Sequence, residues 1–227
     1  MYTVSTDGGT ATRLTDASGG HDFVAAYSPL GTQVMFTRPT TPTDSDDAPA
    51  DLYAVDIDGT HVVRLNPPGT IVGISGTGPL SEWSPDGTRV AFVGSRGRDF
   101  WANSDDRAVF VTNADGSHAT RITDWGDGDT VSWSPDGALL AISTKPVSIF
   151  QIGLVRPDGT DLHTVPAPVE SLGRYAPQWS PDGKRLVFLS LQGGGNAELA
   201  TVRTDGTELV RIVLSDPAPS NWRWIEH

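Results

Sequence analysis

The feature that most constrains the fold is a five-residue motif, Trp-Ser-Pro-Asp-Gly, that occurs three times. The copies begin at Trp83, Trp133 and Trp179, and a weaker copy, Tyr-Ser-Pro-Leu-Gly, begins at Tyr27. The motif serines, at positions 28, 84, 134 and 180, are separated by 56, 50 and 46 residues. Such periods are typical of β-propeller blades with loop insertions, because a compact blade takes roughly 40–45 residues.

A second module, Asp-Gly followed by Thr or Ser, comes after each copy of the first. It begins at Asp58, Asp115, Asp158 and Asp205, and a related Asp-Gly-Gly begins at Asp7. Proline presets φ for a turn and glycine supplies the positive φ that closes it, while Asp-Gly between alternating segments predicts a hairpin. Each period therefore predicts four antiparallel strands, A to D, with a Pro-Asp-Gly turn between A and B and an Asp-Gly turn between C and D.

These modules, together with the Thr-Arg-Leu-Thr segment at 12–15 and its counterpart at 120–123, resemble the WD40-like repeats of TolB-like β-propellers. The resemblance covers nearly the whole chain and implies an all-β propeller. The family includes periplasmic interaction proteins, propeller domains of prolyl-oligopeptidase-like enzymes and a few lyases, so it implies no single function. We expect the motif tryptophans to pack between blades and the motif aspartates to form turns.

We predict a single propeller domain, residues 1–227, with five blades of four-stranded antiparallel sheet. Four blades occupy about residues 21–65, 78–123, 129–165 and 174–214, and a split blade joins residues 1–15 to 218–227. The terminal segments supply strands C, D and A of the split blade, but no segment supplies strand B. Three outcomes stay open: a three-stranded closing blade, a fragment of a longer propeller, or a gap that accepts a strand from a partner.

Charge and composition exclude several classes of partner and chemistry. The formal charge of −12 argues against binding to nucleic acid or to an anionic membrane. The absence of cysteine excludes disulfides and thiol catalysis, and no stretch is apolar enough for membrane insertion. No signal peptide is expected in this chain. We expect a periplasmic or extracellular location if the resemblance holds and the chain is a mature form, and a cytoplasmic one otherwise; a monomer is favoured.

The candidate ligand-binding residues lie in the B–C and D–A loops, which emerge on one face of a propeller, here called the long-loop face. Two arginines beside two aromatic residues suit a carboxylate, a sugar or a peptide end. Alternatively, the arginines pair with Asp99, Asp105 or Asp106 while the tryptophan caps the core. The full candidate set is Arg96, Arg98, Phe100, Trp101, His21, Arg174, Tyr175 and Trp125.

Metal-binding and catalytic signals are weaker. Two acidic loops carry oxygen ligands suited to calcium, although neither has EF-hand spacing, so solvated loops are favoured and no cofactor is expected. Their residues are Asp44, Asp46, Asp47, Asp124, Asp127 and Asp129. No histidine pair has zinc spacing, and no Gly-x-Ser-x-Gly elbow occurs. We therefore assign no catalytic residue.

Three functions remain open. We favour a non-catalytic binding scaffold that recognises a protein, peptide or small ligand through the long-loop face. The first alternative is a propeller enzyme acting on carbohydrate, a lyase or hydrolase, with acid/base groups drawn from Asp22, Glu82, Asp129 and Glu170. The second is an assembly module that uses the incomplete closing blade.

Overall fold

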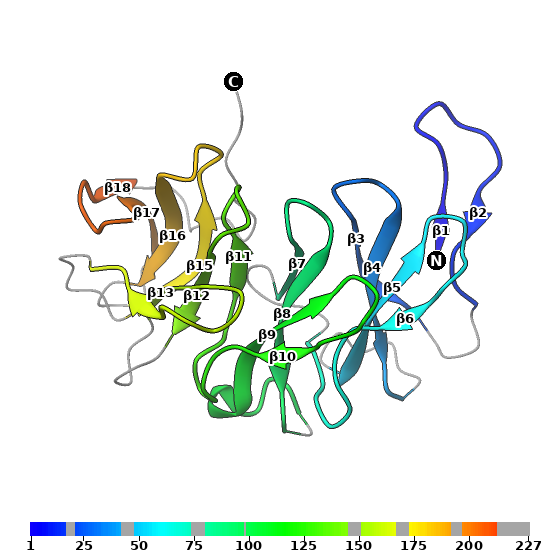
Figure 1. Cartoon of the computed structure of the whole chain (residues 1–227), viewed down its shortest axis with the longest axis horizontal. Coiled ribbons are helices and arrows are strands. Elements are labelled where there is room, and N and C mark those ends of the chain that lie inside the picture. The colour runs from blue at the N-terminus through cyan, green and yellow to red at the C-terminus, as the bar shows by residue number, and fades with distance from the viewer. Residues whose placement is uncertain are drawn as a thin grey trace.

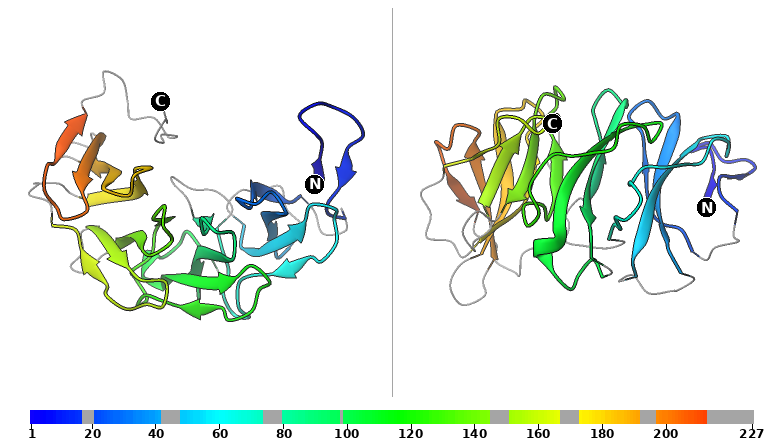
Figure 2. Two further views of the ribbon diagram at one scale, coloured as in Figure 1. Left: turned by 45° about the horizontal axis from the view of Figure 1, so that its top comes forward. Right: turned by 60° about the horizontal axis from the view of Figure 1, so that its bottom comes forward.

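A computed structural model describes residues 1–16, 21–41, 48–73, 80–97, 99–144, 151–166, 173–191 and 197–212, apart from the side chains of residues 24, 25, 174 and 197. Within these ranges the chain forms four four-stranded antiparallel sheets and one two-stranded sheet (Figure 1). The sheets follow one another in chain order along an arc (Figure 2). The predicted all-β propeller architecture is confirmed.

Each four-stranded sheet is one blade, with its strands paired in sequence order. The N-terminal pair is β1 (Tyr2–Thr3) and β2 (Thr12–Arg13). Blade 1 contains β3 (Phe23–Tyr27), β4 (Gln33–Pro39), β5 (Ala50–Asp56) and β6 (Val63–Arg64). Blade 2 contains β7 (Ser81–Trp83), β8 (Arg89–Ser95), β9 (Arg107–Asn113) and β10 (Thr120–Arg121), with a 3-10 helix, η1 (Ser104–Asp106), before β9. Blade 3 contains β11 (Val131–Trp133), β12 (Leu140–Thr144), β13 (Gln151–Val155) and β14 (His163–Thr164). Blade 4 contains β15 (Gly173–Trp179), β16 (Arg185–Leu191), β17 (Ala197–Arg203) and β18 (Val210–Ile212).

The motif tryptophans join each blade to the one before it. All three are buried, at most 8 % exposed. Each indole Nε1 donates to the carbonyl oxygen one residue before the corresponding aromatic residue of the preceding blade. The bonds are Trp83 to Ala26 (3.2 Å), Trp133 to Glu82 (3.2 Å) and Trp179 to Ser132 (3.1 Å). The predicted packing of these residues between blades is confirmed.

The Ser-Pro-Asp-Gly segments form closed turns. In blade 2 the Ser84 hydroxyl donates to Asp86 Oδ1 at 2.6 Å and accepts from the Arg89 backbone N–H at 2.9 Å. Gly87 has a φ of +70°, which a side chain would disfavour. Hydrogen bonds from Ser84 and the Thr88 backbone lower the pKa of Asp86 to about 2. The motif aspartates are turn formers, as predicted.

Hydrophobic clusters fill the space between successive sheets. The cluster between blades 1 and 2 includes Leu52, Trp83 and Phe92, and similar clusters follow at the next two seams. A fourth cluster packs Leu14 and Met1, beside the β1–β2 pair, against Phe36 of blade 1. The core is therefore a row of seams between blades rather than a single centre.

The closing blade stays a prediction, because residues 213–227 lie outside the described ranges. On the blade 1 side, Tyr27 occupies the position that tryptophan has in the other blades. It is 56 % exposed, and its hydroxyl hydrogen-bonds to Thr3 Oγ1 at 2.7 Å. No helix in the described part of the chain is long and apolar enough to cross a membrane.

The outer strands of the first three blades are short. Strand D of blade 2, β10, spans only Thr120–Arg121 and begins two residues after His118. His118 has a φ of +57° and His61 a φ of +51°, so both lie in turns that precede strand D. Asp161 and Glu208 have the same left-handed backbone at the same turn position. An extended strand cannot start before such a residue.

Candidate ligand-binding site on the long-loop face

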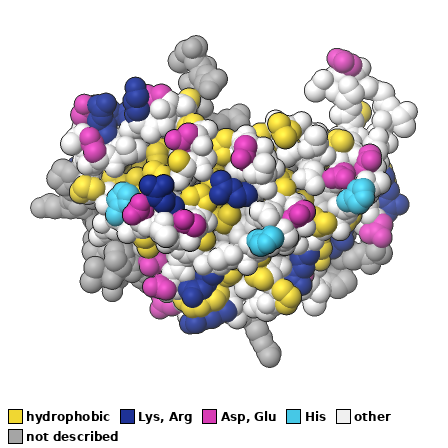
Figure 3. Space-filling view, in the orientation of Figure 1, with side chains coloured by type: hydrophobic (Ala, Val, Ile, Leu, Met, Phe, Trp, Pro, Cys, Tyr) yellow, Lys and Arg dark blue, Asp and Glu magenta, His cyan; other side chains and the backbone are white. Residues whose placement is uncertain are grey.

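Two guanidinium groups lie over one tryptophan on the long-loop face. Arg96 Cζ is 4.9 Å from the centroid of the Trp125 ring, and Arg121 Cζ is 5.0 Å from it. Arg96 comes from the B–C loop of blade 2, Arg121 from β10, and Trp125 from the D–A loop that follows. These three residues are called the Trp125 platform below. In Figure 3, basic side chains adjoin hydrophobic ones at the lower edge of the molecule, where the long loops of Figure 1 lie.

The glycines of the D–A loop place Trp125 beside Arg96. Gly126 has a φ of +97° and donates its N–H to the Arg107 carbonyl at 2.8 Å. A Cβ on Gly128 would lie 2.8 Å from the Ala108 carbonyl carbon, so only glycine lets the loop approach β9 so closely. The loop is therefore held against blade 2, with Trp125 in edge-on contact with the Phe110 ring at 6.0 Å.

The arginines of the platform have internal partners but stay accessible. Arg96 Nε donates to Asp106 Oδ1 at 2.9 Å, and the Arg96 side chain is 53 % exposed. Arg121 donates to the Thr123 carbonyl at 2.6 Å and lies 3.8 Å from the exposed carboxylate of Asp124. A guanidinium carries five N–H donors, so each arginine can keep these bonds and still donate to a ligand.

Another arginine of blade 2, Arg107, is buried and stabilises the loops around it. Arg107 is buried, donates to the Phe100 carbonyl at 2.9 Å and forms an ion pair with Asp129. Its guanidinium also lies 4.8 Å from the Phe100 ring and 5.3 Å from the Trp101 ring. These contacts tie the B–C loop of blade 2 to the entry of β11. Arg107 is not among the residues predicted from the sequence, because it begins a strand and belongs to no motif.

Several predicted ligand-binding residues have structural roles. Phe100 is fully buried between blades 2 and 3, where it belongs to the hydrophobic core, and its contact with a ligand stays a prediction. Trp101 packs against the same core, and its buried Nε1 makes no hydrogen bond within the described residues. Arg96 pairs with Asp106, as the alternative interpretation expected, and also contacts Trp125. Arg98 lies outside the described ranges.

The remaining candidates belong to blades 1 and 4. His21 is exposed just before β3. Arg174 of β15 pairs through its backbone with Ser190 of β16, and the Arg174 side chain is not described. Burial, and to a smaller extent the negative charge of Asp129, raise the pKa of Tyr175. A shared site for His21, Arg174 and Tyr175 remains a prediction.

The candidate acid/base groups are bound to separate partners. Asp22 accepts two hydrogen bonds from Arg38, at 2.7 and 3.2 Å. Asp129 is paired with Arg107. Glu82 Oε2 accepts the Trp133 backbone N–H at 2.7 Å, and burial raises the pKa of Glu82 to about 7. Glu170 lies outside the described ranges. The three described carboxylates therefore serve three different contacts.

The acidic loop at 124–129 does not direct its carboxylates to one point. Asp124 is 96 % exposed, Asp127 accepts the Thr144 hydroxyl, and Asp129 pairs with Arg107. Among the described residues, no three of His, Asp or Glu are grouped as possible metal ligands. The other acidic candidates, Asp44, Asp46 and Asp47, lie outside the described ranges.

The repeated blades, the inter-blade tryptophans and the loop-bearing face define a β-propeller of the WD40-like class. The chain belongs to the TolB β-propeller domain family, whose sequence profile matches residues 20–224. A protein of Agrobacterium fabrum, "Uncharacterized protein Atu1656", is 29 % identical over 109 residues, which are 48 % of this chain and 34 % of that protein. The chain thus spans about a third of this curated relative.

Solved structures share the fold at low sequence identity. TolB from Acinetobacter baumannii has a TM-score of 0.61 and 15 % identity, over 92 % of this chain and 47 % of that one. Oligogalacturonate lyase in complex with manganese has a TM-score of 0.65 and 19 % identity, over 92 % of this chain and 57 % of that one. The likeness establishes the propeller in both comparisons and extends to proteins of different function.

Proposed function

We propose that this protein is a non-catalytic binding module whose Trp125 platform receives an anionic group of a protein, peptide or small ligand. The observation that carries the proposal is the contact of Arg96 and Arg121 with the Trp125 ring. In a chain with a formal charge of −12, two accessible guanidiniums on one aromatic ring form a local site for a carboxylate. The tryptophan adds apolar contact area beside it.

The placement on loops supports binding over catalysis. The platform sits where three segments of blades 2 and 3 meet on a rigid sheet scaffold, which is where propeller-like folds carry recognition residues. The described candidate acid/base groups are held by separate ion pairs and seam contacts. Acid/base catalysis needs such groups close together, with separated pKa values.

Ligand selection followed by substitution tests the proposal. Binders would be selected from peptides with free C-termini and from an array of acidic oligosaccharides. Because a hydrogen bond to a charged group is worth about 1.5–3 kcal/mol, Arg121→Ala should weaken selected binders about tenfold or more, and Trp125→Ala should do the same. Arg156→Ala, which removes an exposed arginine paired with Asp161 elsewhere, is the charge-matched control. Binders that respond equally to all three changes would refute the proposal.

A second candidate is an enzyme acting on carbohydrate. The observation in its favour is the pKa of Glu82, about 7, which suits a general acid or base near neutral pH. One solved structure with the same fold is an oligogalacturonate lyase. We rank it second because the Glu82 carboxylate is engaged in a seam between blades. Turnover of an acidic oligosaccharide that is lost in Glu82→Gln, with the fold intact, would reverse this ranking.

Two further proposals concern the location and the assembly of the protein. Membership of the TolB propeller family supports a periplasmic location and a protein or peptide partner. The assembly alternative, in which a partner's strand completes the closing blade, depends on residues outside the described ranges. Light scattering over a range of concentrations tests it, and a constant monomer mass would count against it.

A further inference from the structure

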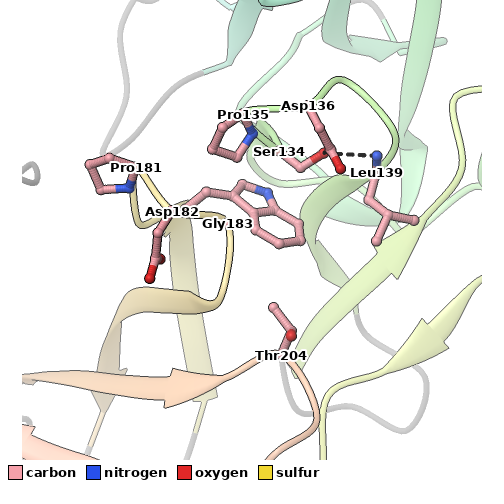
Figure 4. Close-up of a pocket in the computed structure, with 9 residues that line it drawn as sticks. Ser134, Pro135, Asp136, Leu139, Pro181, Asp182, Gly183 and Thr204 are labelled. Atoms are coloured by element: carbon pink, nitrogen blue, oxygen red, sulfur yellow. Dashed lines mark hydrogen bonds between the residues drawn. The ribbon is translucent and has the colours of Figure 1, made fainter.

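A pocket of about 220 Å³ lies between the Ser-Pro-Asp-Gly turns of blades 3 and 4. It is on the short-turn side of the molecule, away from the Trp125 platform, and Figure 4 shows the residues that line it. They are Ser134, Pro135, Asp136, Leu139, Trp179, Pro181, Asp182, Gly183 and Thr204. The pocket is smaller than the roughly 300–1,000 Å³ of sites that enclose whole small-molecule ligands, so it suits a single side chain.

The preceding seam shows what fills the same space. Between blades 2 and 3, the Arg89 guanidinium lies 4.9 Å from the centroid of the Trp133 ring, and its NH2 group is 3.5 Å from the Gly137 carbonyl oxygen. Arg89 and Leu139 occupy the same repeat position, two residues after the motif glycine. Blade 3 therefore has leucine where blade 2 has the arginine that covers the next tryptophan.

The two seams have the same spacing, so the comparison is direct. A Cβ on Gly137 would lie 3.7 Å from Pro85 Cδ, and a Cβ on Gly183 would lie 3.7 Å from Pro135 Cδ. The turns are thus equally close in both seams. The difference between a covered tryptophan and an open pocket comes from the side chain at the position of Arg89 or Leu139.

The lining of the pocket favours a cation. Asp136 and Asp182 both line it, and hydrogen bonds from the motif serines and backbone lower the pKa of both carboxyls. Both side chains are therefore ionised at neutral pH. Each turn uses Oδ1 of its aspartate for these bonds. Trp179 supplies the aromatic ring that a guanidinium would approach, and the prolines supply apolar walls for the methylene groups of its side chain.

We propose that the pocket between blades 3 and 4 binds the guanidinium of an arginine side chain presented by a protein or peptide partner. The guanidinium takes the place over Trp179 that Arg89 takes over Trp133. The chain itself thus supplies an intramolecular copy of the bound state one blade earlier. This site is independent of the Trp125 platform, which attracts the opposite charge on the opposite face.

A titration of L-argininamide, followed by the NMR signal of the Trp179 indole N–H, tests the proposal on the whole chain. L-citrullinamide, which has nearly the same shape without the charge, is the matched ligand. Because a single cation–π contact in a small surface pocket is weak, we expect millimolar binding of argininamide. Citrullinamide should bind about tenfold more weakly or not at all. Equal binding of both ligands, or no shift of the Trp179 signal with argininamide, would overturn the proposal.

Two reciprocal substitutions locate the binding. Leu139→Arg should fill the pocket from within and abolish the Trp179 response, while Leu139→Met, which keeps an uncharged side chain, should preserve it. Arg89→Leu should create a second pocket, so that argininamide shifts the Trp133 indole signal in this variant only. Unchanged signals of the other indoles verify folding of each variant. If Leu139→Arg folds and still binds as the wild type does, the proposal is wrong; if it does not fold, the Arg89→Leu result decides in the same way.

Discussion

Glu82 offers a sharp test of how the blades are joined, because it links blade 2 to blade 3 twice. Its Oε2 accepts the Trp133 backbone N–H at 2.7 Å, and its carbonyl oxygen accepts the Trp133 Nε1–H at 3.2 Å. The equivalent positions in the other blades hold Ala26, Ser132 and Gln178, none of which is ionisable. Glu82→Gln should therefore keep an acceptor for Trp133 while removing the only titrating group at this position.

The expected effect follows from the pKa of Glu82. Burial raises it from an ordinary value of 4.5 to about 7, against the opposing hydrogen bonds from Trp133 and Ser132. Well below pH 4.5 the carboxyl is protonated in both the folded and the unfolded chain, so it adds no pH dependence to the free energy of unfolding. Between pH 4.5 and 7 the unfolded chain releases the proton and the folded chain keeps it, so the free energy of unfolding falls as pH rises. At 1.36 kcal/mol per pH unit, the loss reaches at most about 3 kcal/mol above pH 7.

Urea unfolding of the wild type and of Glu82→Gln at several pH values measures this loss. The variant should gain stability relative to the wild type as pH rises from 4.5 to 8, by up to about 3 kcal/mol. Asp124→Asn, which changes a 96 % exposed carboxylate, is the control and should show no such trend. A stability difference between Glu82→Gln and the wild type that is constant with pH would refute the reasoning.

Three further substitutions test the contacts between blades and around the loops. Gly206→Ala places a Cβ 2.0 Å from the Pro166 carbonyl oxygen at a φ of +85°, so the free energy of unfolding should fall by about 2 kcal/mol or more, measured by urea unfolding. Arg107→Leu leaves the Asp129 carboxylate without its ion-pair partner and should destabilise by about 3 kcal/mol. Adding Asp129→Asn to Arg107→Leu should recover part of that loss, because it removes the unpaired charge. If the effects of Arg107→Leu and Asp129→Asn on the free energy of unfolding are purely additive, the two side chains do not stabilise each other and the prediction is wrong.

The propeller was predictable because its turns are encoded locally. Serine, proline, aspartate and glycine at fixed spacing set the φ values and side-chain hydrogen bonds of a turn without reference to the rest of the chain. The short strand D of blade 2 was not predictable on the same basis. His118 adopts a φ of +57°, and His61, Asp161 and Glu208 have the same left-handed backbone at the same turn position. These three residue types do not by themselves specify a left-handed backbone.

The candidate site was predictable only in part, because exposure depends on residues that are distant in sequence. Arg96 and Trp125 were both placed on the long-loop face, but their contact requires the close approach of Gly128 to Ala108. Phe100 was expected to face a ligand. In the structure it is buried, the Arg107 guanidinium stacks on its ring, and Arg107 Nε donates a hydrogen bond to its carbonyl oxygen. Neighbours along the chain therefore indicated which loop carries Arg96, but not which of its side chains are buried in the core.

The differences between seams suggest where specificity resides in this fold. The motif tryptophan and the turn glycine are present at each seam from blade 1 to blade 4, so they determine only that the blades join. Two positions of the preceding blade vary around each tryptophan. One is the residue just before that blade's own motif aromatic residue, and the other is the residue two places after that blade's motif glycine. At Trp133 these are Glu82 and Arg89. The titratable Glu82 carboxylate accepts the Trp133 backbone N–H, and the Arg89 guanidinium covers the Trp133 ring. At Trp179 they are Ser132 and Leu139, which leave a pocket beside two carboxylates. The repeated residues thus build the scaffold, and the substitutions at two positions per blade decide whether a seam is sealed, pH-sensitive or open to a ligand.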